Sequence, residues 1–186
     1  LGLAAAARGK PRQAIEYYEQ ALAIAREIDD RRNEGAWLGN LGNAYAALGE
    51  PRKAIEYYEK ILKLHREIAD RRGEGSDLGN LGNAYVALKK PRKAIGYYEQ
   101  ALAIAQEIGD RKRKGSRLGN LGNAYVALGE PRKAIEYYEQ ALTLSKEIGA
   151  RRGAGNALGN LGMAYANLGG PRQGTEYHAR ATATAD

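Results

Sequence analysis

The sequence predicts an all-α protein in which pairs of helices repeat along the chain and stack into a solenoid. Two patterns carry this prediction. A block that reads Leu-Gly-Asn-Leu-Gly-Asn-Ala-Tyr stands at residues 38–45, 78–85 and 118–125, and returns at residues 158–165 with Met163 in place of an asparagine. Prolines recur every 40 residues, at Pro11, Pro51, Pro91, Pro131 and Pro171. A fixed period of this length indicates a repeat architecture, because each helix pair can bury its apolar face only against its neighbours.

The first helix of each period is expected to run from about Glu34 to Leu48. Four apolar residues recur at helical spacing on one face of this helix. They are Leu38, Leu41, Tyr45 and Leu48. Gly49 follows directly, and glycine is the residue that most readily takes the left-handed conformation after a helix.

The second helix is expected to begin at Pro51, because proline is tolerated at the first helical position. We expect it to end in a polar turn at residues 70–73, before the next period begins. Its apolar residues recur at intervals of three and four and indicate one buried face. They are Ala54, Ile55, Tyr58, Ile61, Leu62 and Ile68.

The repeated residues resemble the tetratricopeptide repeat signature. They are Leu38, Leu41, Gly42, Tyr45, Ala54 and Tyr58, with Ala21, Ala101 or Ala141 three positions after the second tyrosine. The resemblance covers nearly the whole chain. It implies a right-handed superhelix of antiparallel helix pairs, in which Gly42 and Ala54 allow close approach and the first helices line a concave, peptide-holding groove. The 40-residue period resembles kinesin light chains, the polarity adaptor that links G-protein subunits to the spindle, and many bacterial signalling proteins.

We expect a single array over residues 1–186. It would consist of a partial first repeat (1–30), full repeats at 31–70, 71–110 and 111–150, and a last repeat (151–186) with a degraded second helix. The degradation is expected because Gly174, Thr175 and His178 stand where earlier repeats carry Ala54, Ile55 and Tyr58. Because the chain starts inside a repeat and lacks an initiator methionine, we expect it to be part of something longer.

Composition narrows the classes of function. The net charge of +7 and a pI near 9.5 favour anionic partners. No cysteine is present, which excludes disulfides and thiolate chemistry. No apolar run approaches the roughly 20 residues that span a bilayer, so we expect no membrane partner and a cytoplasmic location. His65 and His178 lack repeated companions and no phosphate-binding loop follows a strand, so we expect no enzyme, no metal site and no cofactor.

A ladder of asparagines is the strongest candidate for a binding site. Asparagine is a mediocre helix former, yet it repeats at fixed positions on the polar side of the first helices. Side-chain amides carry donors and an acceptor, so a ladder of them could hold the backbone of a bound peptide. Inheritance by duplication, or bonding to a neighbouring helix, would explain the same pattern. The residues are Asn40, Asn80, Asn120 and Asn160, joined by Asn43, Asn83 and Asn123.

One position varies between repeats and supplies two further candidates. Trp37 could anchor a partner or cover the helices beneath it. Arg117, with the basic run at residues 111–114, would face an acidic segment of the partner. Gly39 and its equivalents, next to the ladder, indicate that a ligand backbone or a neighbouring helix approaches closely.

Three hypotheses of function remain. The first is a scaffold that binds a protein or peptide segment in the concave groove. The second is self-association into a homo-oligomer. The third is nucleic-acid binding through a basic turn at residues 111–117, which is disfavoured because the groove lacks aromatic residues interleaved with arginine.

Overall fold

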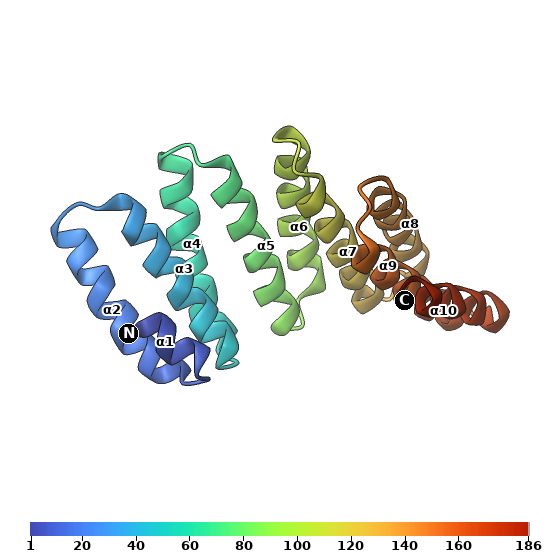
Figure 1. Ribbon diagram of the computed structural model, residues 1–186, viewed down its shortest axis with the longest axis horizontal. Helices are drawn as coiled ribbons and strands as arrows, with labels where there is room; N and C mark the ends of the chain where they lie inside the picture. The colour runs from blue at the N-terminus through green and yellow to red at the C-terminus, as the bar shows by residue number, and fades with distance from the viewer. Residues whose placement is uncertain (186) are drawn as a thin grey trace. The chain divides into compact units, whose positions relative to one another are not determined.

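The computed structural model describes residues 1–185, and every regular element in that range is a helix (Figure 1). The helices within this range are α1 (Gly2–Ala7), α2 (Pro11–Glu27), α3 (Arg31–Ala47), α4 (Pro51–Glu67), α5 (Arg71–Ala87), α6 (Pro91–Glu107), α7 (Arg111–Leu128), α8 (Pro131–Glu147), α9 (Arg151–Asn167) and α10 (Pro171–Ala185). The predicted all-α class and the start of each second helix at a repeated proline are confirmed.

The chain divides into two compact units, Leu1–Lys90 and Pro91–Asp186. In the first unit, α1 to α5 pack consecutively, each helix against the next along the chain. In the second unit, α6 to α10 do the same, and α7 also contacts α9. Within each unit, Figure 1 shows consecutive helices running in opposite directions, joined by short turns. This is the packing in helix pairs that the repeat pattern predicted.

The first helices begin earlier than the sequence analysis placed them. Helix α3 starts at Arg31 rather than near Glu34, and residues 71–73 form the first turn of α5 rather than a polar connection. The cause is an aspartate N-cap, whose side-chain oxygen accepts a hydrogen bond from a backbone N–H that the helix itself leaves unsatisfied. These bonds join Asp30 to Asn33 N at 3.0 Å, Asp70 to Gly73 N at 2.9 Å and Asp110 to Arg113 N at 3.0 Å.

For the same reason the expected basic turn at residues 111–117 is wrong. Asp110 caps α7, so residues 111–117 form its first two turns. The basic residues therefore lie on a helix with fixed directions instead of in a loop.

The connections between helices use one left-handed residue each. Gly49 has φ +72°, which confirms its predicted role after α3. At the equivalent point after the second helices, Gly109 and Gly149 both have φ +67°, whereas Ala69 takes φ +56°. An L-residue pays roughly 1–2 kcal/mol in this conformation, so Ala69 is held there by the packing of the flanking helices.

Within each unit, the core lies between helices that follow one another along the chain. Leu41, Leu81, Leu121 and Leu161 are fully buried, as are Ala54, Ala94 and Ala134. Ile68 was expected on the buried face but is 49% exposed, because α4 ends one residue before it.

Helix α10 is formed over Pro171–Ala185 and packs on α9, although its sequence was expected to be degraded. Gly162 accounts for this contact. A Cβ there would lie 2.9 Å from His178 Cδ2 and 3.0 Å from the Gly174 carbonyl oxygen, so the two helices approach closely. In the part of the chain that the structure describes, no helix is long and apolar enough to cross a membrane.

We expect Ala69→Gly to raise the free energy of unfolding by about 0.5 kcal/mol. Glycine removes the left-handed penalty of roughly 1–2 kcal/mol and loses roughly 0.5–1 kcal/mol through chain entropy. Urea unfolding of the whole chain, followed by circular dichroism, measures the difference. The control is Ala36→Gly, an exposed site inside α3 that should lose stability by roughly 0.5–1 kcal/mol. A loss of the same size at both sites would contradict the strain argument.

Candidate functional site

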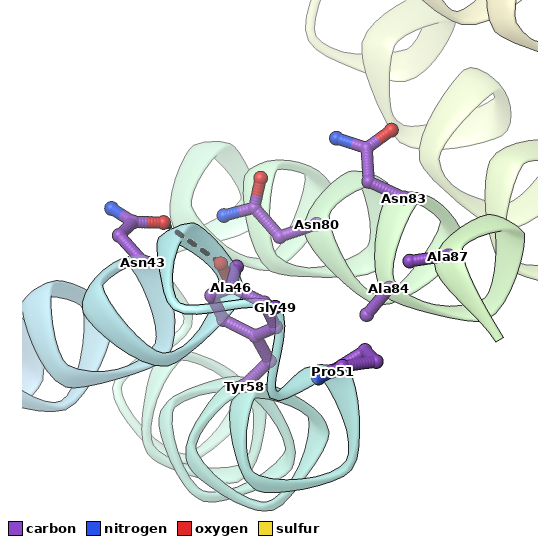
Figure 2. Close-up of a pocket in the computed structure, with 9 residues that line it drawn as sticks. All are labelled: Asn43, Ala46, Gly49, Pro51, Tyr58, Asn80, Asn83, Ala84 and Ala87. Atoms are coloured by element: carbon purple, nitrogen blue, oxygen red, sulfur yellow. Dashed lines mark hydrogen bonds between the residues drawn. The ribbon is translucent and has the colours of Figure 1, made fainter.

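A glycine, a tyrosine and an asparagine form a connected group within the helix pair α3–α4. A Cβ at Gly42 would overlap the ring of Tyr58, so only glycine lets this ring lie flat across α3. The Tyr58 hydroxyl then reaches Asn43 and donates to its Oδ1 at 2.8 Å. Burial raises the pKa of Tyr58 to about 12, so the hydroxyl keeps its proton at neutral pH. The bond fixes the amide, and its Nδ2 is left pointing away from the tyrosine (Figure 2).

The same group recurs in the pair α7–α8. Gly122 accommodates the ring of Tyr138, whose hydroxyl donates to Asn123 Oδ1 at 2.7 Å. Burial raises the pKa of Tyr138 to about 12. Here Asn160 Nδ2, from α9, lies 3.4 Å from the same Oδ1 as a second donor. Amides from neighbouring first helices therefore lie next to each other on this surface.

The first unit has a hollow beside these amides. It has a volume of about 490 Å³ and is lined by Asn43, Tyr58, Asn80 and Asn83, together with small residues such as Ala84. Figure 2 shows the three amides along one side of the hollow, with Ala84, Ala87 and Pro51 opposite. Three of the predicted ladder residues thus meet at one place.

The second unit has a hollow of about 620 Å³ bounded by α7, α8 and α9. Asn120, Asn123 and Asn160 line it, next to Gly119. Within 4 Å, an added Cβ at Gly119 or at Gly159 would meet no atom outside its own helix, so open space lies beside them. At Gly39 the corresponding atom would lie 3.3 Å from Ile61 Cδ1, where a neighbouring helix does approach.

The variable position packs against the preceding second helix. Trp37 stacks on Tyr18 with ring centroids 5.9 Å apart. Arg117 lies near Tyr98. Burial lowers the pKa of this arginine, and the nearby tyrosine raises it by a smaller amount. Both contacts match the alternative in which these side chains cover the stack, although their roles in binding stay predictions. Asn40, another of the predicted ladder residues, is half-buried on α3.

Asp77 takes this position in α5 and forms a polar pair that the sequence analysis missed. Its Oδ2 lies 2.6 Å from His65 Nδ1 on α4, and the aspartate is 4% exposed. Burial raises the pKa of Asp77 to about 6, although the contact with His65 acts in the opposite direction. The sequence did contain a signal for this pair. His65 and Asp77 occur together in one repeat, whereas the other repeats carry alanine or serine in place of the histidine and no aspartate in place of Asp77.

Glu74, one turn before Asp77, is held by two arginines. Arg66 Nε donates to Glu74 at 2.8 Å, and Arg71 binds the other carboxylate oxygen. Burial alone would raise the pKa of Glu74, but these two bonds outweigh it and keep the pKa below its usual value. Among the described residues, no group of three or more His, Cys, Asp or Glu side chains is arranged to hold a metal ion.

The tyrosine–asparagine bond was also missed, although its spacing is visible in the sequence. Asn43 and Tyr58 are separated by 15 positions, as are Asn123 and Tyr138. Because an amide and a phenol recur at this spacing across a turn, a contact between them could have been inferred.

The tetratricopeptide repeat model matches residues 1–67, 34–107, 74–147 and 116–186, which together span the chain. The chain belongs to the tetratricopeptide repeat family. Such repeat proteins are generally scaffolds for protein interactions and are typically non-catalytic. A comparison of the sequence with curated proteins gives no significant match.

Solved structures confirm the tetratricopeptide fold. BtubC (BKLC) from P. vanneervenii is 26% identical, with a TM-score of 0.88, over 100% of this chain and 77% of that chain. A putative kinesin light chain from Podosopora anserina, with nearly identical repeats, is 21% identical, with a TM-score of 0.83, over 99% of this chain and 91% of that chain. A Rap protein complexed with competence and sporulation factor is 17% identical, with a TM-score of 0.81, over 99% of this chain and 51% of that chain.

We expect Asp77→Asn to flatten the pH dependence of stability. The folded-state pKa of about 6 exceeds the unfolded value near 3.8, so the stabilising contribution of Asp77 is present below about pH 4. It is lost as the pH rises through about 6, by at most about 3 kcal/mol for a shift of this size. Urea unfolding between about pH 4 and 7 should show a shallower slope for the variant. Asp29→Asn, at a carboxylate that is 87% exposed, is the control; parallel curves for Asp77→Asn and wild type would contradict the expectation.

Proposed function

We propose that this protein is a scaffold that binds a peptide or protein segment along the amide-bearing surface of its first helices. The observation that carries the proposal is a bond from a buried tyrosine to an asparagine in two helix pairs, Tyr58–Asn43 and Tyr138–Asn123. The bond occupies the amide oxygen and fixes the side chain in one orientation, so its Nδ2 donors are presented in advance. Fixing the donors beforehand lowers the entropy that binding would otherwise cost.

The ladder residues on the neighbouring first helices complete a set of donors and acceptors. Asn80 and Asn83 line the first hollow, and Asn120 and Asn160 line the second. A peptide backbone offers alternating N–H and C=O groups, which such amides can pair with regardless of side-chain sequence. Open space beside Gly119 and Gly159 would admit the backbone of the ligand close to α7 and α9.

Similar proteins support this class of ligand. The Rap protein was crystallised with a peptide factor, competence and sporulation factor, and the second unit of the present chain offers cations for an acidic segment. We propose Trp37 and Arg117 at the edge of this surface, because Trp37 stacks on Tyr18 and Arg117 is half-buried near Tyr98 of the preceding helix. A protein of this kind would act in the cytoplasm, beside whatever domain or partner uses the captured segment.

Self-association is the second candidate. Exposed apolar side chains favour it, among them Met163 at 54% and Leu3 at 62% exposed. Two copies could bury these residues against each other.

We expect Asn80→Ala/Asn120→Ala to weaken peptide binding by roughly 10- to 100-fold, because two hydrogen bonds are lost at about 1 kcal/mol or more each. Peptides selected by wild type from a displayed random library supply the probe, and fluorescence anisotropy measures each dissociation constant. The matched control is Asn33→Ala/Asn167→Ala, which removes two exposed asparagines outside both hollows.

Equal binding by the ladder variant and the control would overturn the assignment of the amides. Failure to select any peptide, with a concentration-dependent mass in sedimentation, would favour the homo-oligomer instead. Circular dichroism of each variant shows whether its helices are intact.

A further inference from the structure

Helix α9 lacks the aspartate cap that begins the equivalent helices α3, α5 and α7. Asp30, Asp70 and Asp110 cap α3, α5 and α7, whereas Ala150 stands at the N-cap of α9 and offers no side-chain oxygen. The N–H of Gly153, at the position that those aspartates serve, therefore meets no capping side chain. Helix N-termini carry unsatisfied N–H groups and a partial positive charge of about half a unit, so they favour an anion.

A buried hydroxyl lies beside this end of α9. Ser145, on α8, is 6% exposed and lines the hollow of the second unit. A Cβ on Gly153 would lie 2.7 Å from Ser145 Oγ, so the hydroxyl is next to the first turn of α9. Within residues 1–185, Ser145 Oγ makes no hydrogen bond. Because Ser145 lines the hollow, a ligand bound there could supply the hydroxyl with a hydrogen-bond partner.

The charged side chains that line the hollow are all positive. Lys112, Arg151 and Arg152 line it, and no carboxylate among the described residues does. None of the three cations forms an ion pair within the described part of the chain. Neighbouring Arg113, by contrast, is paired with Asp110. The cations at the hollow are therefore available to a ligand.

The space exists because both sides of the α8–α9 contact carry small residues. Ala157 stands where α3 carries Trp37 and α7 carries Arg117, and Ser145 faces it from α8. Trp37 stacks on Tyr18 and Arg117 is half-buried near Tyr98, and the smaller Ala157 cannot fill the same volume. This leaves room for a group of several atoms beside Gly153 and Ser145.

We propose that this hollow is an oxyanion subsite, in which a phosphoryl or carboxylate group on the bound peptide completes the N-terminus of α9. The oxygens of the anion accept hydrogen bonds from Gly153 N–H and Ser145 Oγ, and Arg151, Arg152 and Lys112 balance its charge. The identity of the carrier as a peptide rests on the proposed function, whereas binding of the anion itself does not. A dianion gains more than a monoanion from several cations and a helix N-terminus, so a phosphoryl group should bind more tightly.

The test is a titration of the ¹⁵N-labelled whole chain with inorganic phosphate, and separately with acetate, followed by amide chemical shifts. We expect a saturable shift of the Gly153 amide with phosphate and a weaker response to acetate. Equal affinities would assign the subsite to carboxylates and phosphoryl groups alike. A linear, unsaturated shift spread over the basic residues would overturn the proposal.

Ala150→Asp supplies the missing cap from within the chain. We expect it to weaken phosphate binding by at least about tenfold, because its carboxylate occupies the N–H groups and repels the anion. The same variant should raise the melting temperature by about 2–4 °C, as expected for a gain near 1 kcal/mol in a chain of this size. Unchanged phosphate affinity in a variant with a raised melting temperature would contradict the site.

Ser145→Ala tests the hydroxyl, and the fold should tolerate it because Ala25 and Ala105 stand at the equivalent positions. We expect phosphate affinity to fall by about tenfold, the usual range for a hydrogen bond to a charged group. Thr143→Ala, which removes an exposed hydroxyl from the same helix, is the matched control and should leave affinity unchanged. Equal effects of the two variants would overturn the role of Ser145.

Peptide binding separates this proposal from the proposed function. In Ala150→Asp, peptides should still bind, but without a preference for acidic or phosphorylated ones. Saturable phosphate binding in a protein that selects no peptide would uphold the subsite and refute the scaffold.

Discussion

The close contact between a glycine of one helix and a tyrosine ring of the next is the constraint on which the described helix pairs depend. At Gly42 and Gly122 any side chain would overlap Tyr58 or Tyr138, so the ring sets the distance between the two helices. The same ring carries a hydroxyl to the far side of the first helix, where it orients an asparagine. Packing and surface chemistry are thereby coupled, because the buried residue that spaces the helices also fixes a surface amide.

Against this framework, two positions that face each other across the contact between a second helix and the next first helix differ between repeats, and their occupants decide the local character of the surface. A stacked indole at Trp37 covers Tyr18, and a buried pair at His65 and Asp77 replaces apolar packing with a polar contact. Small residues at Ser145 and Ala157 leave space instead. Repeats that look nearly identical in sequence therefore present different surfaces, because each difference lies at a contact between successive helices.

Helix ends show how local signals act together with packing. Aspartate at the N-cap extends α3, α5 and α7 into a stretch that looks like a polar turn, because hydrophobic periodicity begins only later. An expectation built on apolar spacing alone placed these starts about three residues too late, although the capping signal was present. Helix α10 formed despite poor helix-forming residues, because the glycines at positions 162 and 174 let it pack closely on α9.

The sequence by itself determined the helical class, the pairing of helices, the starts of the second helices at the prolines, the left-handed Gly49 and the amide ladder as a candidate. These follow from periodicity and from single-residue conformational preferences, which are local properties of the chain. Only the tertiary structure decided that Trp37 stacks on Tyr18, that Asn43 and Asn123 are each held by a tyrosine hydroxyl, and that Ser145 lies beside the uncapped α9. Each of these depends on which side chains from different helices meet, and that is set by the distance and rotation between helices rather than by spacing along the chain.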